Sequence, residues 1–121
     1  MSLSLLLRCI DKPKTRDYYR NILHFDVVES SELSLRVSKF NTLIIFTELD
    51  LWEQGLQMSG TIYISVPDVE QYFAQIKNIA ELAWPLQDMP YGTREFAVRD
   101  CNGYYLAFMR DDDVLALNKT K

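Results

Sequence analysis

The sequence predicts an α+β fold in which a strand–helix–strand–strand–strand (βαβββ) unit occurs twice. The order of elements expected over residues 2–49 repeats over residues 61–110. A helix-start signal follows the first strand of each half, Asp11-Lys12-Pro13 and then Pro67-Asp68. The second half ends in two alternating runs, REFAVRD and YYLAFMR, which predict a hairpin. Such a repeat predicts two small sheets, each with a helix on one face and the other face free to line a shared cleft.

The first half is expected to begin with a strand over residues 2–10. A helix follows, because the fixed φ of Pro13 suits a first helical turn, and its buried face is marked by Tyr18, Tyr19, Ile22 and Leu23 at helical spacing. Alternation and turn residues then predict three more strands, over 24–29, 33–39 and 42–49. Residues 50–59 show no clean period and are interpreted as a connection.

The second half repeats this order, starting with a strand over 61–66. Its helix has an inward stripe of four apolar residues, Val69, Phe73, Ile76 and Ala80. A short strand over 81–87 contains Pro85, which suits an edge strand or a bulge. Residues 89–92 turn the chain into the final hairpin, where Asn102 and Gly103 are expected to supply the positive φ angles of a tight turn.

Length and composition limit the class of protein. The 121 residues predict a single domain over 1–110, with modules at about 1–50 and about 60–110, and a solvated tail over 111–121 that includes Asp111-Asp112-Asp113. A net charge of −4 disfavours nucleic acid and anionic membranes as partners, since both bind basic surfaces. No apolar run is long enough to span a bilayer, and Cys9 and Cys101 lack metal or redox spacing. These features predict a cytoplasmic protein with two free thiols.

The residues also carry a family resemblance. ISVPDVEQYFAQIKNIAELAWPLQDMPYGTREFAVRDCNGYYLAFMR resembles the second module of the vicinal oxygen chelate superfamily, which includes glyoxalase I, bleomycin- and fosfomycin-resistance proteins and extradiol dioxygenases. IDKPKTRDYYRNILHFDVV is similar to the family's first helix and second strand. The resemblance covers roughly 3–110 and implies tandem βαβββ modules and a homodimer. Two positions depart from the family pattern: Cys101 replaces a turn proline, and His24 stands where the family usually has glycine.

The resemblance also implies a divalent metal, held by His, Glu or Gln on the cleft strands. Carried onto this sequence, those positions are Ser4, Thr61 and Ala107, with Glu48 as a looser match. A hydroxyl pair and a methyl group make a poor ligand set, and the chain has one histidine. We therefore expect no metal and no cofactor, and a cleft that binds rather than reacts.

Strand parity then selects the candidate ligand-binding residues. If the family's metal positions face the cleft, their i+2 neighbours face it too, so Leu6, Arg8, Tyr63, Ser65, Tyr105 and Met109 are expected on the open faces. The opposite parity is more uniformly apolar and fits burial under the helices. Aromatic platforms and ligand-orienting charges complete the set, although each member could instead serve packing or a salt bridge. The candidates are Arg8, Arg36, Phe46, Glu48, Trp52, Thr61, Tyr63, Trp84 and Tyr105.

The function expected from these residues is metal-free binding of a small aromatic or amphipathic molecule. The resemblance implies a homodimer that sequesters its ligand as bleomycin-resistance proteins do, and hence a possible part in antibiotic resistance. One alternative is a divergent metal-dependent lyase, isomerase or dioxygenase that uses Glu48. Another is a structural or regulatory module in which Trp52 and Trp84 are buried against a partner protein. The sequence leaves open whether the chain is an enzyme.

Overall fold

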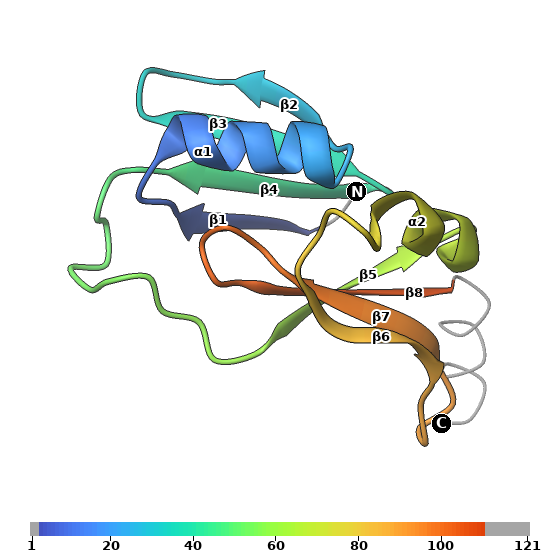
Figure 1. Ribbon diagram of the computed structural model, residues 1–121. Helices are drawn as coiled ribbons and strands as arrows, with labels where there is room; N and C mark the ends of the chain where they lie inside the picture. Colours follow the sequence, from blue (N-terminus) through green and yellow to red (C-terminus); the bar gives the residue numbers. More distant parts are fainter. Residues whose placement is uncertain (1–2, 111–121) are drawn as a thin grey trace. The chain divides into compact units, whose positions relative to one another are not determined.

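The computed structural model describes residues 3–110, which form two compact units (Figure 1). The first unit comprises residues 3–59 with 101–103, and the second comprises 60–100 with 104–110. Each unit holds one four-stranded sheet and one helical segment, in the order strand–helix–strand–strand–strand. This arrangement confirms the predicted α+β fold with its repeated βαβββ unit. The solvated tail predicted over 111–121 lies outside the described residues.

The first unit has the strand order β1-β4-β3-β2, with β1 parallel to β4 and the other pairs antiparallel. Helix α1 continues directly into a π-helical turn, η1, and together they lie along one face of this sheet (Figure 1). The elements are β1 (Ser4–Arg8), α1 (Lys12–Asp17), η1 (Tyr18–Ile22), β2 (Asp26–Glu29), β3 (Ser34–Lys39) and β4 (Thr42–Thr47).

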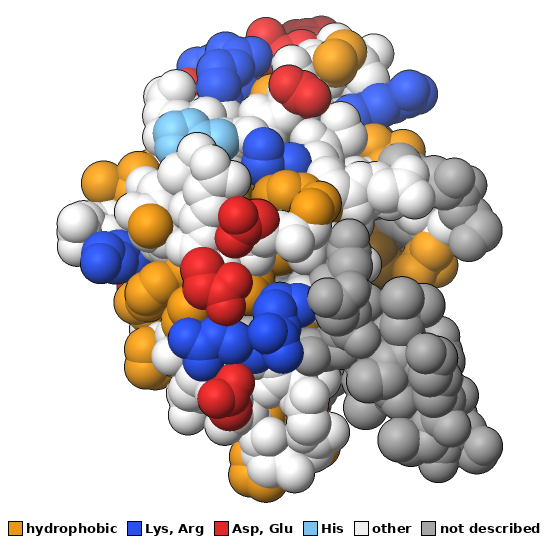
Figure 2. Space-filling model, turned by 90° about the vertical axis from the view of Figure 1, so that its right-hand side faces the viewer, with side chains coloured by type: hydrophobic (Ala, Val, Ile, Leu, Met, Phe, Trp, Pro, Cys, Tyr) orange, Lys and Arg blue, Asp and Glu red, His pale blue; other side chains and the backbone are white. Residues whose placement is uncertain are grey.

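At both ends of the helical segment formed by α1 and η1, hydrogen bonds satisfy backbone or side-chain groups. The Asp11 side chain accepts a hydrogen bond from the Lys14 N–H at 3.0 Å, which caps the N-terminus. At the other end the Leu23 N–H donates to the Tyr18 carbonyl, and His24 follows with a φ of 59°. The family's usual glycine at this position is thus explained by the left-handed backbone that ends the helix. His24, the one histidine of the chain, is exposed (pale blue in Figure 2).

The second unit has the equivalent strand order, β5-β8-β7-β6, again with one parallel pair, β5 with β8. Its helix is capped by Asp68, whose side chain accepts from the Gln71 N–H at 3.0 Å. Within residues 3–110, no helix is long and apolar enough to cross a membrane. The elements are β5 (Thr61–Val66), α2 (Val69–Ile76), β6 (Leu82–Asp88), β7 (Arg94–Arg99) and β8 (Tyr105–Arg110).

Aromatic side chains fill the space between each helix and its sheet. In the second unit, Tyr72 packs edge-on against Phe108 at 5.0 Å between ring centroids, and Phe96 stacks on Phe108 at 5.3 Å. The predicted inward stripe of α2 is right for Val69 and Ile76. Phe73 is half-buried and packs edge-on against Phe96 at 5.0 Å between ring centroids, while Tyr72, which was not predicted, is buried further, and the helix ends before Ala80. Tyr72 is buried because its face of the helix lies over Phe96 and Phe108.

The parity predicted for the strands is confirmed within each sheet. The helix-facing residues Ile64, Val66, Leu106 and Phe108 are buried, as is Cys9 after β1. Leu6, Tyr63 and Tyr105 have the opposite parity and are 44%, 44% and 37% exposed. Each sheet therefore has a face covered by its helix and an open face, a term used below for the side opposite the helix.

One turn and one edge strand refine the sequence predictions. Gly103 has a φ of 88°, but Asn102 keeps a negative φ, so the expectation of two positive φ angles in the β7–β8 turn was wrong. A three-residue loop with one left-handed residue is sufficient here, and Asn102 Nδ2 instead donates to Thr15 Oγ1 at 3.2 Å in the first unit. Pro85 lies on the edge strand β6, within the register shift between Trp84 and Gln87, which confirms the predicted edge or bulge.

Candidate functional site

A carboxylate with no solvent exposure lies in the second unit. Glu95, on β7, is 0% exposed and accepts four hydrogen bonds from side chains. Oε1 accepts from the hydroxyls of Thr93 at 2.6 Å and Tyr91 at 3.0 Å. Oε2 accepts from the Tyr63 hydroxyl and from the Trp84 indole N–H, both at 3.1 Å. All four donors are neutral groups.

This set of donors explains how a carboxyl group can lie fully inside the protein. A buried charge is costly unless hydrogen bonds replace its water, and an ionised carboxylate accepts about four. Hydrogen bonds to a charged acceptor are roughly twice as strong as neutral ones. Among the described residues, no lysine or arginine forms an ion pair with Glu95. Within residues 3–110, the Glu95 carboxyl group is thus held by neutral donors.

The sheet register places two of these donors on opposite sides of a pair of alanines. Across β5, β8, β7 and β6, one row of paired residues is Tyr63, Ala107, Ala97 and Trp84. Tyr63 and Glu95 stand two strands apart, about 10 Å at ordinary strand spacing, so their side chains meet above β8. Ala107 and Ala97 are both 0% exposed although they belong to the open face. The small side chains leave the space that the Tyr63 and Trp84 rings need to reach Glu95.

Irregular backbone on β6 and in the β6–β7 turn supplies the remaining donors. The register shifts on either side of Trp84 change which way its side chain points, as bulges commonly do. The turn is closed by the Met89 N–H, which donates to the Thr93 carbonyl at 2.7 Å, and Gly92 provides a φ of 98°. Tyr91, Thr93 and Glu95 then follow at intervals of two residues, and the hydroxyls of Tyr91 and Thr93 both donate to Glu95.

The tyrosine rings bound to Glu95 are partly exposed. Tyr63 is 44% and Tyr91 is 51% exposed, while Trp84 is half-buried, and their polar ends all meet Glu95. We call these three side chains the aromatic platform. Burial of the hydroxyl raises the pKa of Tyr63 well above its ordinary value, and hydrogen bonds with Tyr91 and Glu95 raise it further. Tyr63 therefore remains a donor to Glu95 at any physiological pH.

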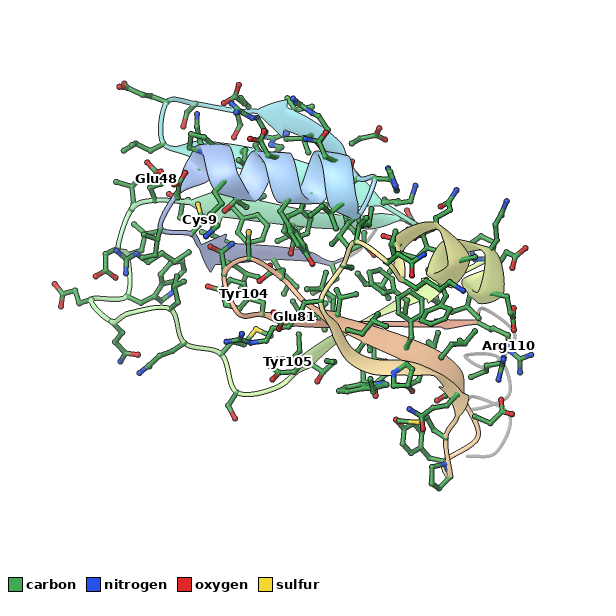
Figure 3. The ribbon with its side chains drawn as sticks, viewed as in Figure 1. Cys9, Glu48, Glu81, Tyr104, Tyr105 and Arg110 are labelled. Atoms are coloured by element: carbon green, nitrogen blue, oxygen red, sulfur yellow. The ribbon has the colours of Figure 1, made fainter. Side chains whose placement is uncertain are left out.

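Four of the predicted ligand-binding residues belong to the second unit. Tyr63 and Trp84 are members of the aromatic platform. Tyr105, on β8 (Figure 3), is 37% exposed and pairs with Thr61 in the row next to that of Tyr63. Two of the residues predicted from the sequence therefore belong to the aromatic platform, and Thr61 and Tyr105 lie in the neighbouring row.

The other predicted residues lie in the first unit and have varied surroundings. Phe46 is fully buried on the helix-facing side, with its ring centroid 5.2 Å from that of Tyr19, so it is a core residue and not part of an open face. Arg8 lies 3.8 Å from the Asp50 carboxylate and donates to the Gln54 carbonyl at 3.2 Å. Arg36 is exposed on β3, and Trp52 is 46% exposed in the connection that follows β4.

Glu48 has a structural partner. Its Oε2 accepts the backbone N–H of Lys12 at 2.7 Å, at the start of α1 (Figure 3). This contact is with the backbone and is not the salt bridge that was the alternative to ligand binding. Glu48 instead satisfies one of the free N–H groups at a helix N-terminus, where a negative charge is favourable.

The positions that the resemblance implies for a metal do not suit one. Ser4 and Thr61 carry hydroxyls, and Ala107 carries a methyl group that is fully buried. Within residues 3–110, no group of three His, Cys, Asp or Glu residues is arranged to hold a metal ion. Cys9 and Cys101 are free thiols, and burial raises the pKa of the Cys9 thiol, which makes it a weak ligand and nucleophile.

Sequence reasoning missed Glu95, Tyr91 and Thr93. The available signal was the spacing Tyr91-x-Thr93-x-Glu95, which puts a tyrosine, a threonine and a glutamate on one side of the same strand and turn. A second signal was the alanine on each central strand, Ala97 and Ala107, with the same parity as Glu95. Together these signals indicate a part of the sheet where large side chains can pack across small ones on the neighbouring strands.

Known structures share this fold. No protein-family model and no curated protein sequence matches the chain. Among solved structures, TioX from Micromonospora sp. ML1 is 19% identical with a TM-score of 0.74, covering 91% of this chain and 98% of its own. A glyoxalase/bleomycin resistance protein/dioxygenase from Alicyclobacillus acidocaldarius is 16% identical with a TM-score of 0.74, covering 91% and 92%. Lactoylglutathione lyase from Agrobacterium tumefaciens is 11% identical with a TM-score of 0.68, covering 92% and 93%.

These similarities confirm the predicted glyoxalase/bleomycin-resistance fold of tandem βαβββ modules. At identities below 20% they concern the fold, and the same fold supports many unrelated activities. What this chain does must be argued from its own side chains.

Proposed function

We propose that the chain binds a small aromatic or amphipathic organic molecule, without a metal, on the aromatic platform of the second unit. One observation carries the proposal: Glu95 fixes the polar ends of Tyr63, Trp84 and Tyr91 while both tyrosine rings keep large exposed surfaces. Rings held in place in this way lose little rotational freedom when a ligand stacks on them. Stacking also adds geometric selectivity to apolar burial.

The arrangement favours binding over catalysis. The Tyr63 hydroxyl has a raised pKa, which makes it a poor proton donor and a poor nucleophile near neutral pH. Glu95 already accepts four hydrogen bonds and is fully buried, so it is badly placed to take a proton from a ligand. By analogy of fold we extend the proposal to a homodimer that sequesters its ligand, as bleomycin-resistance proteins do.

Intrinsic tryptophan fluorescence tests this function directly. We expect planar aromatic compounds to quench wild-type fluorescence saturably, in buffer containing EDTA. Trp84→Phe should abolish the saturable part of the signal, whereas Trp52→Phe, which changes the exposed tryptophan of the first unit, should retain it. Quenching that is lost with Trp52→Phe and kept with Trp84→Phe would place the ligand elsewhere and contradict the proposal.

Metal analysis separates this proposal from the enzyme alternative. We expect freshly purified protein to contain no stoichiometric Zn, Ni, Mn or Fe, and ligand binding to be unaffected by chelator. A stoichiometric metal that is lost in Glu48→Gln, together with turnover of a substrate, would instead support a divergent metal-dependent enzyme. Because Glu48 accepts the Lys12 N–H, that variant also needs a check of its folding by circular dichroism.

A further inference from the structure

The hydrogen bonds to Glu95 determine what the aromatic platform can offer to a ligand. A tyrosine hydroxyl has one hydrogen, and the hydroxyls of Tyr63 and Tyr91 have their acceptors within the cluster, namely the Glu95 carboxylate and, at 3.2 Å, each other. The Trp84 indole N–H, which can only donate, is also used. The groups of the platform that remain available to a ligand are hydroxyl lone pairs and ring faces. Both are electron-rich.

The Glu95 carboxylate, to which the platform side chains donate, is negative like these electron-rich surfaces. The Glu95 carboxylate, which accepts four hydrogen bonds, lies in a region without solvent exposure, where the effective dielectric is lower than in water and electrostatic interactions are stronger. Ring faces are the negative part of the aromatic quadrupole and attract cations. The platform thus combines three features, a carboxylate, lone pairs and ring faces, that all favour positive charge.

The neighbouring cationic side chains already have carboxylate partners. Arg94, beside Glu95 in sequence, donates to Glu70 at 2.8 Å and to Asp88 at 3.2 Å. Arg99, at the other end of β7, lies 3.6 Å from the Glu81 carboxylate. Both arginines therefore form ion pairs with exposed carboxylates, and none of these ion pairs involves Glu95. Within residues 3–110, the hydrogen-bond partners of the Glu95 carboxylate are the neutral donors around it.

We propose that the aromatic platform selects cationic ligands: a protonated amine or a quaternary ammonium carried on or next to an aromatic ring. This inference rests on the proposed binding function and names the ligand class for the same site. A carboxylate or phenolate ligand is disfavoured because no platform donor is available to it and because Glu95 repels it. The net charge of −4 on the chain acts in the same direction at longer range.

A set of probes with one ring system and different charges tests the selection. Tryptophan quenching is measured with 1-naphthylmethylamine, trimethyl(1-naphthylmethyl)ammonium, 1-naphthalenemethanol and 1-naphthoate. We expect both cations to bind at least about ten-fold more tightly than the anion, with the alcohol in between. Equal affinity for all four, or tightest binding of naphthoate, would overturn the inference and leave the binding function standing. Failure of every probe to bind would count against the binding function itself.

Charge-neutral variants connect the selection to Glu95. Glu95→Gln should reduce the cation-to-anion affinity ratio several-fold, because it removes the charge and lets the amide donate to a tyrosine oxygen. Glu32→Gln is the matched control, since it makes the same change of net charge in the exposed turn after β2 of the first unit and should leave the ratio unchanged. An unchanged ratio in folded Glu95→Gln protein would contradict the proposal.

A second variant keeps the test valid if Glu95→Gln does not fold. Tyr91→Phe retains the Glu95 carboxylate and removes the Tyr91 hydroxyl, which is one donor to Glu95 and one source of lone pairs on the platform. We expect it to weaken binding of the primary amine, which donates hydrogen bonds, more than binding of the quaternary ammonium, which cannot. Equal weakening of both cations would show that the hydroxyl oxygen does not contact the amine and would remove that part of the proposal.

Discussion

The middle row of the first sheet consists of Leu6, Ile45, Arg36 and Val28 across its four strands. The equivalent row of the second sheet consists of Tyr63, Ala107, Ala97 and Trp84. In the first sheet the side chains are medium-sized or long, and Leu6, Arg36 and Val28 are exposed. In the second, two fully buried alanines lie between large rings. One strand order thus supports two different open faces.

The next row completes the comparison. Arg8, Thr47 and Ser34 in the first sheet correspond by register to Ser65, Met109 and Glu95 in the second. Ser34 forms hydrogen bonds with the nearby hydroxyls of Ser30 and Ser31 on the surface, whereas Glu95 gathers four donors in the interior. The duplicated backbone provides the positions, and the size of the side chains on the two central strands decides whether a polar network can form above them.

The largest expected effect comes from removing the carboxylate. Glu95→Ala should lower the free energy of unfolding by about 3 kcal/mol, because it leaves buried donors without an acceptor and opens a cavity. Ser34→Ala, at the equivalent position of the first sheet, should change stability by less than about 0.5 kcal/mol, as surface substitutions usually do. Urea denaturation of both variants measures the difference. Equal losses would mean that Glu95 has no special structural role.

The next effect comes from filling the space above β8. Ala107→Leu should destabilise the chain by about 2 kcal/mol, since the larger side chain competes with the rings for the same volume. It should also change the tryptophan emission spectrum by moving Trp84. Ile45→Leu, the volume-conserving change at the equivalent position, should cost about 0.5 kcal/mol and leave the spectrum unaltered. A well-tolerated leucine at 107 would contradict the placement of the rings over the alanines.

A smaller effect is expected at the helix ends, where the two units also differ. His24 has a φ of 59° at the end of the first helical segment, and no such residue follows α2. His24→Gly should raise the free energy of unfolding by about 1 kcal/mol by relieving left-handed strain. Asn78→Gly, in the turn after α2, should lower it by a few tenths, because glycine there only adds freedom to the unfolded chain. A gain from both substitutions would count against the strain at His24.

The smallest effect is a pH dependence that only the second sheet should have. Unfolding returns Tyr63 to its ordinary pKa of 10.0, so the unfolded chain loses this proton first as pH rises. The stabilising contribution of the protonated hydroxyl is complete below pH 10 and is lost as pH rises toward the higher pKa of the folded chain. Tyr63→Phe should flatten this decline in urea midpoints between pH 9 and 11, measured relative to pH 8. Leu6→Phe, at the equivalent position, should not affect it.

Local signals were sufficient to predict most of the fold. Pro13 and the two aspartates that cap the helices mark where the helices begin, and apolar alternation marks the strands, because these preferences act over a few residues. Predictions failed where packing decides. The helix ends before the predicted Ala80, Tyr72 is buried although it was not predicted, and Asn102 keeps a negative φ, because the neighbouring sheet and the loop geometry set those outcomes.

The site was only partly predictable for the same reason. Parity correctly put Tyr63 on an open face, and composition drew attention to Trp84. Glu95 escaped because an acidic residue in an alternating strand usually faces water. Its burial depends on a bulge in β6 and on the Tyr63 side chain, which reaches it from β5, two strands away. Both contacts come from residues distant in sequence. Phe46 was misplaced for a simpler reason, since an aromatic residue on a buried strand fits a core as well as a site.

The two buried alanines also bear on how this surface can change over evolution. A bulkier side chain at 97 or 107 is compatible with the fold only if the ring at 63 or 84 withdraws, and a withdrawn ring leaves the acid at 95 without enough donors. Substitutions at these five positions are therefore coupled, and relatives should retain the whole set or replace it together. An aligned family in which the five positions drift independently would show that natural selection does not treat them as one unit.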